Sequence, residues 1–337
     1  MLNIISRSIV SQHNRGPRKV VLNLIKGLDE IGYPYVVNHA LNATDQLWIH
    51  DDPTALSEAL NLNNETKILV GPNVFTLPAE LPIIETTRNI LWLHPALWVK
   101  NFWETFGTQK LNSAVWPVGV DTDTFKPTNE TKDIVLIYNK QRSAEDVKKV
   151  CITLNTLGEN FEIITYGSYE ETDYKKLLNR SKAIIWIGRS ESQGIGLEEA
   201  LSLDVPALIW DIEKFGQWEG SGKEKFTQAQ LDFSPVTSAP YFNEECGIKF
   251  TKPETLEENL KTFLDKLDSF SPRAYIENNL TLASQAKAFI KIYATDLGVS
   301  ETELKDQSLR STRIWQNATL PFRARIWTKD VIRRFIS

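Results

Sequence analysis

Short apolar runs alternate with amphipathic segments of helix length along the first part of the chain. Residues 3–7 predict a strand, and residues 18–33 predict a helix whose apolar side chains recur every three or four positions. Further short runs rich in β-branched and aromatic residues predict strands at 35–38, 46–50, 67–71 and 89–93. Strands that alternate with helices form parallel β–α–β units.

A stretch with two prolines and one glycine, residues 115–127, interrupts this alternation, and the pattern then starts again. New strands are predicted at 133–139, 161–167, 183–188 and 206–211, with helical segments between them. We therefore expect an α/β protein with two Rossmann-like, doubly wound domains that face a central crevice. Ligands of such sheets bind at the carboxyl ends of the strands. The expected parts are an N-terminal domain at 1–125, a C-terminal domain at 126–297 and a basic tail at 298–337.

Composition narrows the class of protein. The chain has 337 residues, 42% of them hydrophobic and 24% charged, and a formal net charge of −5. An acidic balance disfavours general binding of nucleic acid, which requires a basic surface. The two cysteines lack the spacing of a zinc or redox motif. An apolar signal core and long apolar runs are also missing from the sequence, so we expect a cytoplasmic protein.

Residues 191–199, ESQGIGLEE, lie between the predicted strand at 183–188 and an apolar helix. A glycine-containing loop that leads from a parallel strand into a helix exposes backbone N–H groups and the positive end of the helix dipole, which suits phosphate. Gly194 permits close approach of the backbone to a ligand. Glu191 in the loop and Glu199 about one turn into the helix can both accept hydrogen bonds from hydroxyl groups. The spacing alone is equally compatible with two solvated glutamates.

The surrounding sequence resembles the signature of two glutamates separated by seven residues in retaining GT-B glycosyltransferases, in particular glycosyltransferase family 4. The matching residues are Glu191, Gly194, Glu199–Ala200 and Val205–Pro206. Residues 116–127 are similar to the interdomain stretch of that family, and residues 15–28 to the glycine loop that leads into its first helix. The resemblance covers about residues 3–295.

The resemblance implies a GT-B fold and transfer of a sugar, with retention, from a nucleotide-sugar to an acceptor hydroxyl. Glu199 would bind the ribose hydroxyls, and Glu191 the sugar beside its reacting carbon. Lys140 and Arg142 stand near the place where many relatives carry Gly-Arg and a lysine, so we assign them to the donor diphosphate. The implied catalytic residues are Glu191, Lys140 and Arg142. The implied donor-binding residues are Gly16, Gly167, Ser168, Tyr169, Ser192, Gln193, Gly194, Ile195 and Glu199.

The implied partners are a nucleotide-sugar donor and a glycan or lipid-linked acceptor, with no cofactor. Asp121 and Asp123 match a metal-binding motif of the other large glycosyltransferase fold. They lie inside the linker motif, however, so we expect a turn or capping role and no metal. His50 and His94 follow predicted strands, and we expect them to be structural.

Two alternatives remain. A sugar-nucleotide epimerase of the same fold is disfavoured because no carboxylate–histidine set is evident. A catalytically degenerate subunit that binds a sugar-nucleotide is compatible with the altered Gly-Arg position, although both glutamates are intact.

The tail is basic and aromatic. Residues 310–337 carry seven Arg or Lys side chains against Asp330, with four Trp or Phe side chains among them. We expect this tail to pack across the domains rather than to make a peripheral contact with an anionic membrane, which is the alternative.

Overall fold

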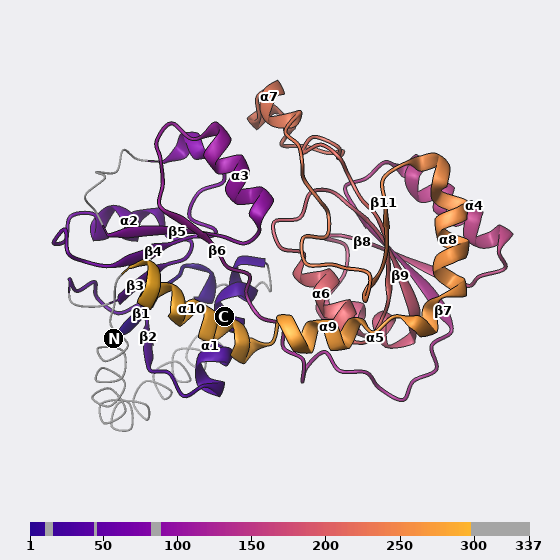
Figure 1. Cartoon of the computed structure of the whole chain (residues 1–337), viewed down its shortest axis with the longest axis horizontal. Helices are drawn as coiled ribbons and strands as arrows, with labels where there is room; N and C mark the ends of the chain where they lie inside the picture. The colour runs from indigo at the N-terminus through magenta and orange to yellow at the C-terminus, as the bar shows by residue number, and fades with distance from the viewer. Residues whose placement is uncertain (11–15, 44–45, 82–88, 298–337) are drawn as a thin grey trace, which may run out of the picture.

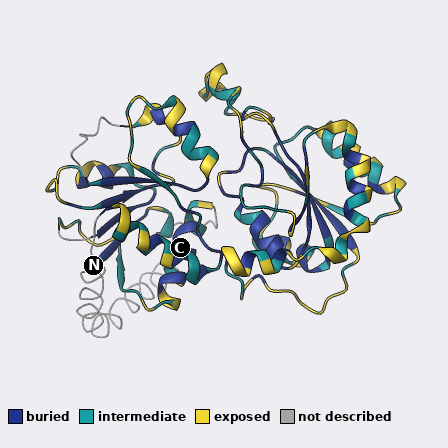
Figure 2. Ribbon diagram, in the orientation of Figure 1, coloured by how far each residue is buried: buried dark blue, intermediate teal, exposed yellow. Residues whose placement is uncertain are grey.

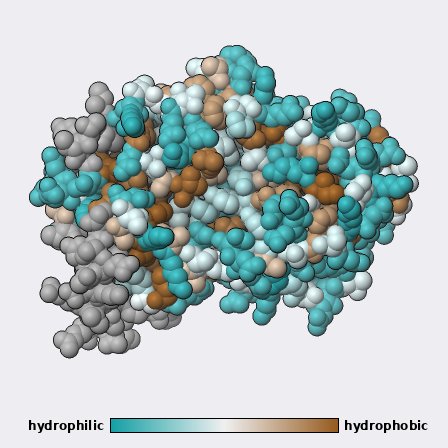
Figure 3. Space-filling model, in the orientation of Figure 1, coloured by the Kyte–Doolittle hydropathy of each residue, from teal (hydrophilic) through white to brown (hydrophobic). Residues whose placement is uncertain are grey.

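Two α/β domains lie side by side in a computed structural model of the chain, which describes residues 1–10, 16–43, 46–81 and 89–297 (Figure 1). Each domain has a parallel sheet at its centre, and the strands of both sheets are largely buried (Figure 2). Strands covered on both faces are apolar along their whole length, which explains why short continuous apolar runs predicted them. Hydrophilic side chains cover most of the face seen in Figure 3.

The first sheet has six parallel strands in the order β2-β1-β3-β4-β5-β6. In its centre Ile4 pairs with Val37 on one side and with Trp48 on the other. The strands are β1 (Leu2–Ile5), β2 (Tyr35–Val37), β3 (Gln46–Ile49), β4 (Ile68–Val70), β5 (Ile90–His94) and β6 (Ser113–Val115).

Helices α1 (Gly16–Glu30) and α10 (Leu282–Asp296) pack on one face of the first sheet. The core on this face is aromatic: Trp48, Trp116 and Phe289 meet edge to face, with ring centroids 4.9 to 5.9 Å apart. Helix α2 (Pro53–Ala59) packs on the opposite face, with Asp52 accepting hydrogen bonds at its N-terminus. Helix α3 (Leu97–Phe106) places Trp103 against Trp92 of β5.

The second sheet has five parallel strands in the order β11-β10-β9-β7-β8. The chain runs outward from β7 to β8 and outward from β9 to β10, so the topological switch point lies between β7 and β9. The strands are β7 (Ile134–Lys140), β8 (Phe161–Thr165), β9 (Ser181–Gly188), β10 (Ala207–Trp210) and β11 (Gly247–Phe250). Helices α4 (Ala144–Thr156) and α8 (Leu256–Asp265) cover one face, and α5 (Glu171–Arg180), α6 (Ile195–Ser202) and α9 (Pro272–Asn279) cover the other.

Within residues 1–297, so far as they are described, the chain crosses between the domains twice, and the two crossings lie against each other. Val120 in the first crossing donates its N–H to Leu280 O in the second, over 2.7 Å. A Cβ at Gly119 would lie 2.5 Å from Thr281 O, so this close approach requires glycine. Helix α10 then packs on the first sheet, which corrects the predicted boundary: residues 282–297 belong to the first domain and not to a domain at 126–297.

The domains also meet through an aromatic cluster. The connection from β10 to β11, residues 211–246, is long and contains α7 (Gln228–Leu231). It lays Phe215 and Phe233 against Phe102 of α3, with ring centroids 5.2 Å apart in both pairs. This cluster holds α3 of the first domain against the second domain.

The predicted α/β class and its two doubly wound domains are confirmed. The short strands β6 and β11 and helices α2, α3 and α7 to α10 were not predicted. The basic tail lies outside the described residues. Among the helices that are described, none has the length and apolar character needed to cross a membrane.

Candidate active site

The glutamate motif lies at the switch point of the second sheet. β9 ends at Gly188, and α6 begins at Ile195 after a short loop. Gly194 caps α6 with φ 93° and ψ 38°, a left-handed conformation that other residues adopt at a cost. Glu191 and Glu199 are only 7% and 3% exposed. They are therefore not a solvated pair, and buried carboxylates need partners.

The partner of Glu191 is Lys140, the last residue of β7. Its Nζ lies 2.6 Å from Oε1 and 2.8 Å from Oε2 of Glu191. The pair forms because β7 and β9 are neighbours, with Lys140 beside Gly188. The same ammonium lies 4.3 Å from the centroid of the half-exposed Tyr166 ring. In addition, Trp98 of the first domain donates its indole N–H to Glu191 O over 2.8 Å, so the loop contacts both domains.

The partner of Glu199 comes from the other domain. Lys19 of α1 places Nζ 2.6 Å from Glu199 Oε1 and 3.1 Å from Glu171 Oε2. Burial raises the pKa of Glu199 to about 7, and the attraction of Lys19 opposes that rise. Burial lowers the pKa of Lys19, but Glu199 and Glu171 outweigh this effect, so it is raised overall. This ion pair joins the first domain to the motif helix.

The side-chain amide of Gln193 contacts the backbone of Val118, a contact that the sequence did not predict. Its Oε1 accepts from Val118 N over 3.0 Å, and its Nε2 donates to Val118 O and to Glu198 Oε2 over 2.8 and 2.9 Å. These bonds use both N–H groups of the amide, which leaves none for a donor sugar. Gln193 therefore joins the loop to the first interdomain crossing, and its predicted place among the donor-binding residues stays a prediction.

Glu198 is a buried carboxyl on the far side of this amide. It is 1% exposed, and burial raises its pKa well above the usual range, although the bond from Gln193 lowers it. A carboxyl with so little access to water favours its neutral form. Glu198 thus belongs to the contact between the loop and the linker.

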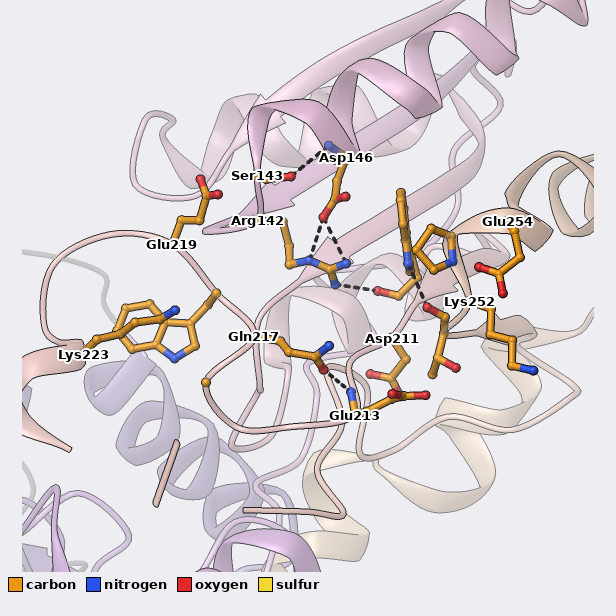
Figure 4. A pocket seen from close by; sticks show the side chains of 15 residues that line it. Arg142, Ser143, Asp146, Asp211, Glu213, Gln217, Glu219, Lys223, Lys252 and Glu254 are labelled. Atoms are coloured by element: carbon orange, nitrogen blue, oxygen red, sulfur yellow. Dashed lines mark hydrogen bonds and ion pairs between the residues drawn. The ribbon is translucent and has the colours of Figure 1, made fainter. Parts of the chain in front are cut away.

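Arg142 separates from Lys140 although the two are nearly adjacent in sequence. Its guanidinium donates to Gly188 O and Trp210 O, over 3.3 and 3.2 Å, and pairs with Asp146 (Figure 4). It lines a cavity of about 630 Å³ at the ends of β7, β10 and β11, together with Trp210 and Trp218. The structure thus brings Lys140 to Glu191 but gives Arg142 a set of protein partners of its own.

The remaining predicted residues lie on loops around the motif. Gly167 has φ 84° and, with Ser168, forms the turn after β8. Tyr169 shares a hydrogen bond of 2.9 Å with Tyr138 of β7. Ser192 is exposed, Ile195 begins α6, and Gly16 is the exposed first residue of α1.

Two cations of this site were not predicted from the sequence. Lys19 lies 180 positions before Glu199 in the chain. Its helix was predicted from the apolar face alone, which gives no information about Lys19. Arg189 directly follows β9, donates to Gln141 Oε1 and lies with its guanidinium carbon 4.2 Å from the Trp218 ring. Burial lowers the pKa of Arg189, and the nearby Glu191 opposes this. Its position immediately before the motif was the one signal available.

Asp121, His50 and His94 contact other parts of the protein. Asp121 accepts from Thr124 N over 2.8 Å and pairs with Lys26 at 2.6 Å, which confirms the turn role. His50 and His94 are buried, and burial lowers the pKa of each to about 4, so both rings are neutral near pH 7. Nε2 of His50 lies 2.9 Å from Pro17 O, and the ring of His94 lies against Trp103.

No family model matches the chain, and no curated protein matches it. Solved structures do match. Sucrose-phosphate synthase from Thermosynechococcus elongatus has a TM-score of 0.56 and 10% identity, over 87% of this chain and 98% of that one. The lipopolysaccharide outer core galactosyltransferase WaaB, in its apo form, has a TM-score of 0.52 and 12% identity, over 88% and 99% of the two chains.

This chain has the GT-B fold. TarM also matches, with a TM-score of 0.50 and 11% identity over 82% of this chain. The chain spans 58% of the length of TarM and nearly all of the other two. At these identities the similarity concerns the fold, and the chemistry has to be argued from the site.

Proposed function

We propose that this protein is a retaining glycosyltransferase that moves a sugar from a nucleotide-sugar to an acceptor hydroxyl without a metal ion. The observation that carries the proposal is the pair of buried glutamates on one loop and the helix that follows it, Glu191 in the loop and Glu199 within α6. Each is ion-paired with a lysine, at the switch point of a GT-B sheet that faces the other domain. Solved structures of the same fold include a galactosyltransferase and a sucrose-phosphate synthase.

In this proposal the second domain holds the donor. Glu199 accepts hydrogen bonds from the ribose, and the turn at Gly167, Ser168 and Tyr169 lines the base. The N-terminus of α6, with the backbone of Gly194 and Ile195, faces the diphosphate. Lys140 lies beside Glu191, so it is the cation that we assign to the leaving diphosphate. Arg142 holds strand ends and supports the site from behind.

The proposed step breaks the bond between the reacting sugar carbon and the diphosphate oxygen. The acceptor oxygen forms its new bond on the same face of the sugar. The proton of the acceptor hydroxyl passes to the departing phosphate oxygen, so no protein base is required. Glu191 stabilises the positive charge that builds on the sugar, and Lys140 the negative charge on the diphosphate. The domain contacts exclude water, which would hydrolyse the donor.

The test is product analysis by NMR, with a panel of nucleotide-sugars, in the presence and absence of candidate glycan and lipid-linked acceptors. We expect a glycoside whose anomeric configuration matches that of the donor, and an undiminished rate in excess chelator. Conversion of the donor to an epimer without an acceptor would indicate an epimerase. Donor binding without turnover under any condition would indicate a degenerate subunit.

A further inference from the structure

Lys19 occupies an unusual position for a lysine on a helix that covers a sheet. It belongs to the first domain, yet its ammonium lies between Glu171 and Glu199 of the second domain. The side chains of Lys19 and Glu199 are 17% and 4% exposed, so water screens this contact weakly.

The hydrogen bonds of this cluster are incomplete. An ammonium has three N–H donors, and the described residues accept two from Lys19, one at Glu199 Oε1 and one at Glu171 Oε2. Within the described part of the chain, no residue donates to Glu199 Oε2. As far as the described residues go, a donor of Lys19 without a protein acceptor therefore lies next to an acceptor of Glu199 without a protein donor.

The charge of the cluster limits what can complete it. Two carboxylates surround one ammonium, so a further anion such as a phosphate would be repelled. A hydroxyl group suits both partners, because its oxygen can accept from the ammonium while its hydrogen goes to the carboxylate. Two neighbouring hydroxyls on one ring would use both free positions.

We infer that Lys19 is a donor-binding residue of the first domain, which reads the ribose diol of the nucleotide jointly with Glu199. This inference rests on the proposed function, because it takes the ligand to be a nucleotide-sugar. Lys19 also favours the charged form of the buried Glu199 carboxyl, which accepts hydrogen bonds more strongly than the neutral form. Because Lys19 and Glu199 belong to different domains, the ribose is bound fully only when the domains are in contact.

The experiment compares ribonucleoside diphosphates with their 2′-deoxy counterparts by isothermal titration calorimetry. The proteins are the full chain, Lys19→Met and Lys19→Gln, which keeps N–H donors without the charge. Lys26→Met is the matched control, since Lys26 lies on the same helix but pairs with Asp121 and is half exposed. Circular dichroism and thermal melting verify that each variant is folded.

We expect the wild type to prefer the ribose form by roughly tenfold or more, as for a charged hydrogen bond that is lost. Lys19→Met should weaken binding of the ribose form by a similar factor and bring the preference close to one. Lys19→Gln should keep part of the preference, and Lys26→Met should match the wild type. A lysine with a merely structural role would leave the preference unchanged.

Two outcomes would overturn the inference alone, provided that the wild type binds the donor and transfers the sugar. In the first, Lys19→Met keeps the wild-type preference for the ribose form. In the second, Lys19→Met binds the nucleoside diphosphate more tightly than the wild type. The second result would mean that Lys19 competes with the donor for Glu199. A folded wild type that binds no nucleoside diphosphate would overturn the proposed function itself.

Discussion

Lys140 and Glu191 are joined across neighbouring strands, with 2.6 Å between the ammonium nitrogen and the nearer carboxylate oxygen. In the proposed function, Glu191 stabilises positive charge on the sugar and Lys140 stabilises negative charge on the leaving diphosphate. Holding them in contact fixes both side chains before a ligand arrives. Such preorganisation is the usual source of electrostatic stabilisation in a transition state.

The first prediction separates Lys140 from Arg142. Lys140→Met should lower kcat by roughly a hundredfold, because it removes the charge that stabilises the leaving group. Arg142→Met should leave kcat within a small factor but reduce the free energy of unfolding by about 1–3 kcal/mol, because buried carbonyl groups and Asp146 lose their donor. Steady-state kinetics and urea unfolding measure the two effects. A large loss of kcat in a stably folded Arg142→Met would restore the diphosphate role that the sequence suggested.

A second prediction concerns the two glutamates. Glu199→Gln should mainly raise KM for the donor, because the ribose is bound alike in ground and transition states. Glu191→Gln should mainly lower kcat, by roughly a hundredfold, because its interaction strengthens as the sugar gains positive charge. Donor-saturation kinetics on folded variants make the comparison. Near-normal kinetics in both would contradict the proposed function.

The third prediction is a pH dependence of donor binding. Burial raises the pKa of Glu199 to about 7, and protonation removes the carboxylate that accepts from the ribose. If only the carboxylate binds, the dissociation constant at pH 6 should therefore be about tenfold higher than at a pH well above 7, and about fivefold higher than at pH 7. Titration calorimetry across this range tests the prediction. In Glu199→Gln the dependence should disappear, and its persistence would assign it to another group.

The raised pKa of Glu199 also affects the stability of the fold, but with the opposite pH dependence: low pH weakens donor binding and favours folding. Because the pKa of Glu199 is higher in the folded chain than the usual 4.5, the folded state holds this proton more tightly than the unfolded state. The contribution of Glu199 to stability is complete below pH 4.5 and is lost as pH rises through about 7.

The fourth prediction concerns the contact between Gln193 and the linker. Gln193→Ala leaves both backbone groups of Val118 without their partner in a buried place. We expect the free energy of unfolding to decrease by about 2 kcal/mol or more. Gln228→Ala is the control, because this glutamine bonds an exposed Asp232, and its change should stay near 0.5 kcal/mol. If urea unfolding gave equal decreases in the free energy of unfolding for the two substitutions, the structural role of Gln193 would be contradicted.

Local patterns were sufficient to predict the strands of both sheets that are buried on both faces. They did not predict α10 as a helix, and they placed its residues in the wrong domain. Even a recognised amphipathic helix indicates only that one of its faces is covered, and not by which sheet. β6 is only three residues long and partly buried, so its pattern is too short to identify. The prediction errors thus concern both which elements form, as for β6, and which elements meet, as for α10.

The site residues show the same difference between what a local pattern predicts and what depends on contacts between distant elements. The pairing of Lys140 with Glu191 follows from two adjacent strand ends, and both residues were identified from sequence. Lys19 could not be found in this way, because its contact with Glu199 depends on how two separately patterned domains meet. Gln193 stands inside a recognisable motif, but the direction of its side chain is set by the backbone of Val118, which the motif does not contain.

The path of α10 back to the first sheet affects the order in which the protein can be completed on the ribosome. Residues 133–280 form one continuous segment that contains every strand of the second sheet, so this domain can close as soon as it emerges. The strands of the first sheet are synthesised before those of the second, but the sheet lacks Phe289 and Tyr293 of its core until α10 emerges. Of the two domains, the one whose strands come first is therefore completed second, and its apolar face stays uncovered until α10 is made.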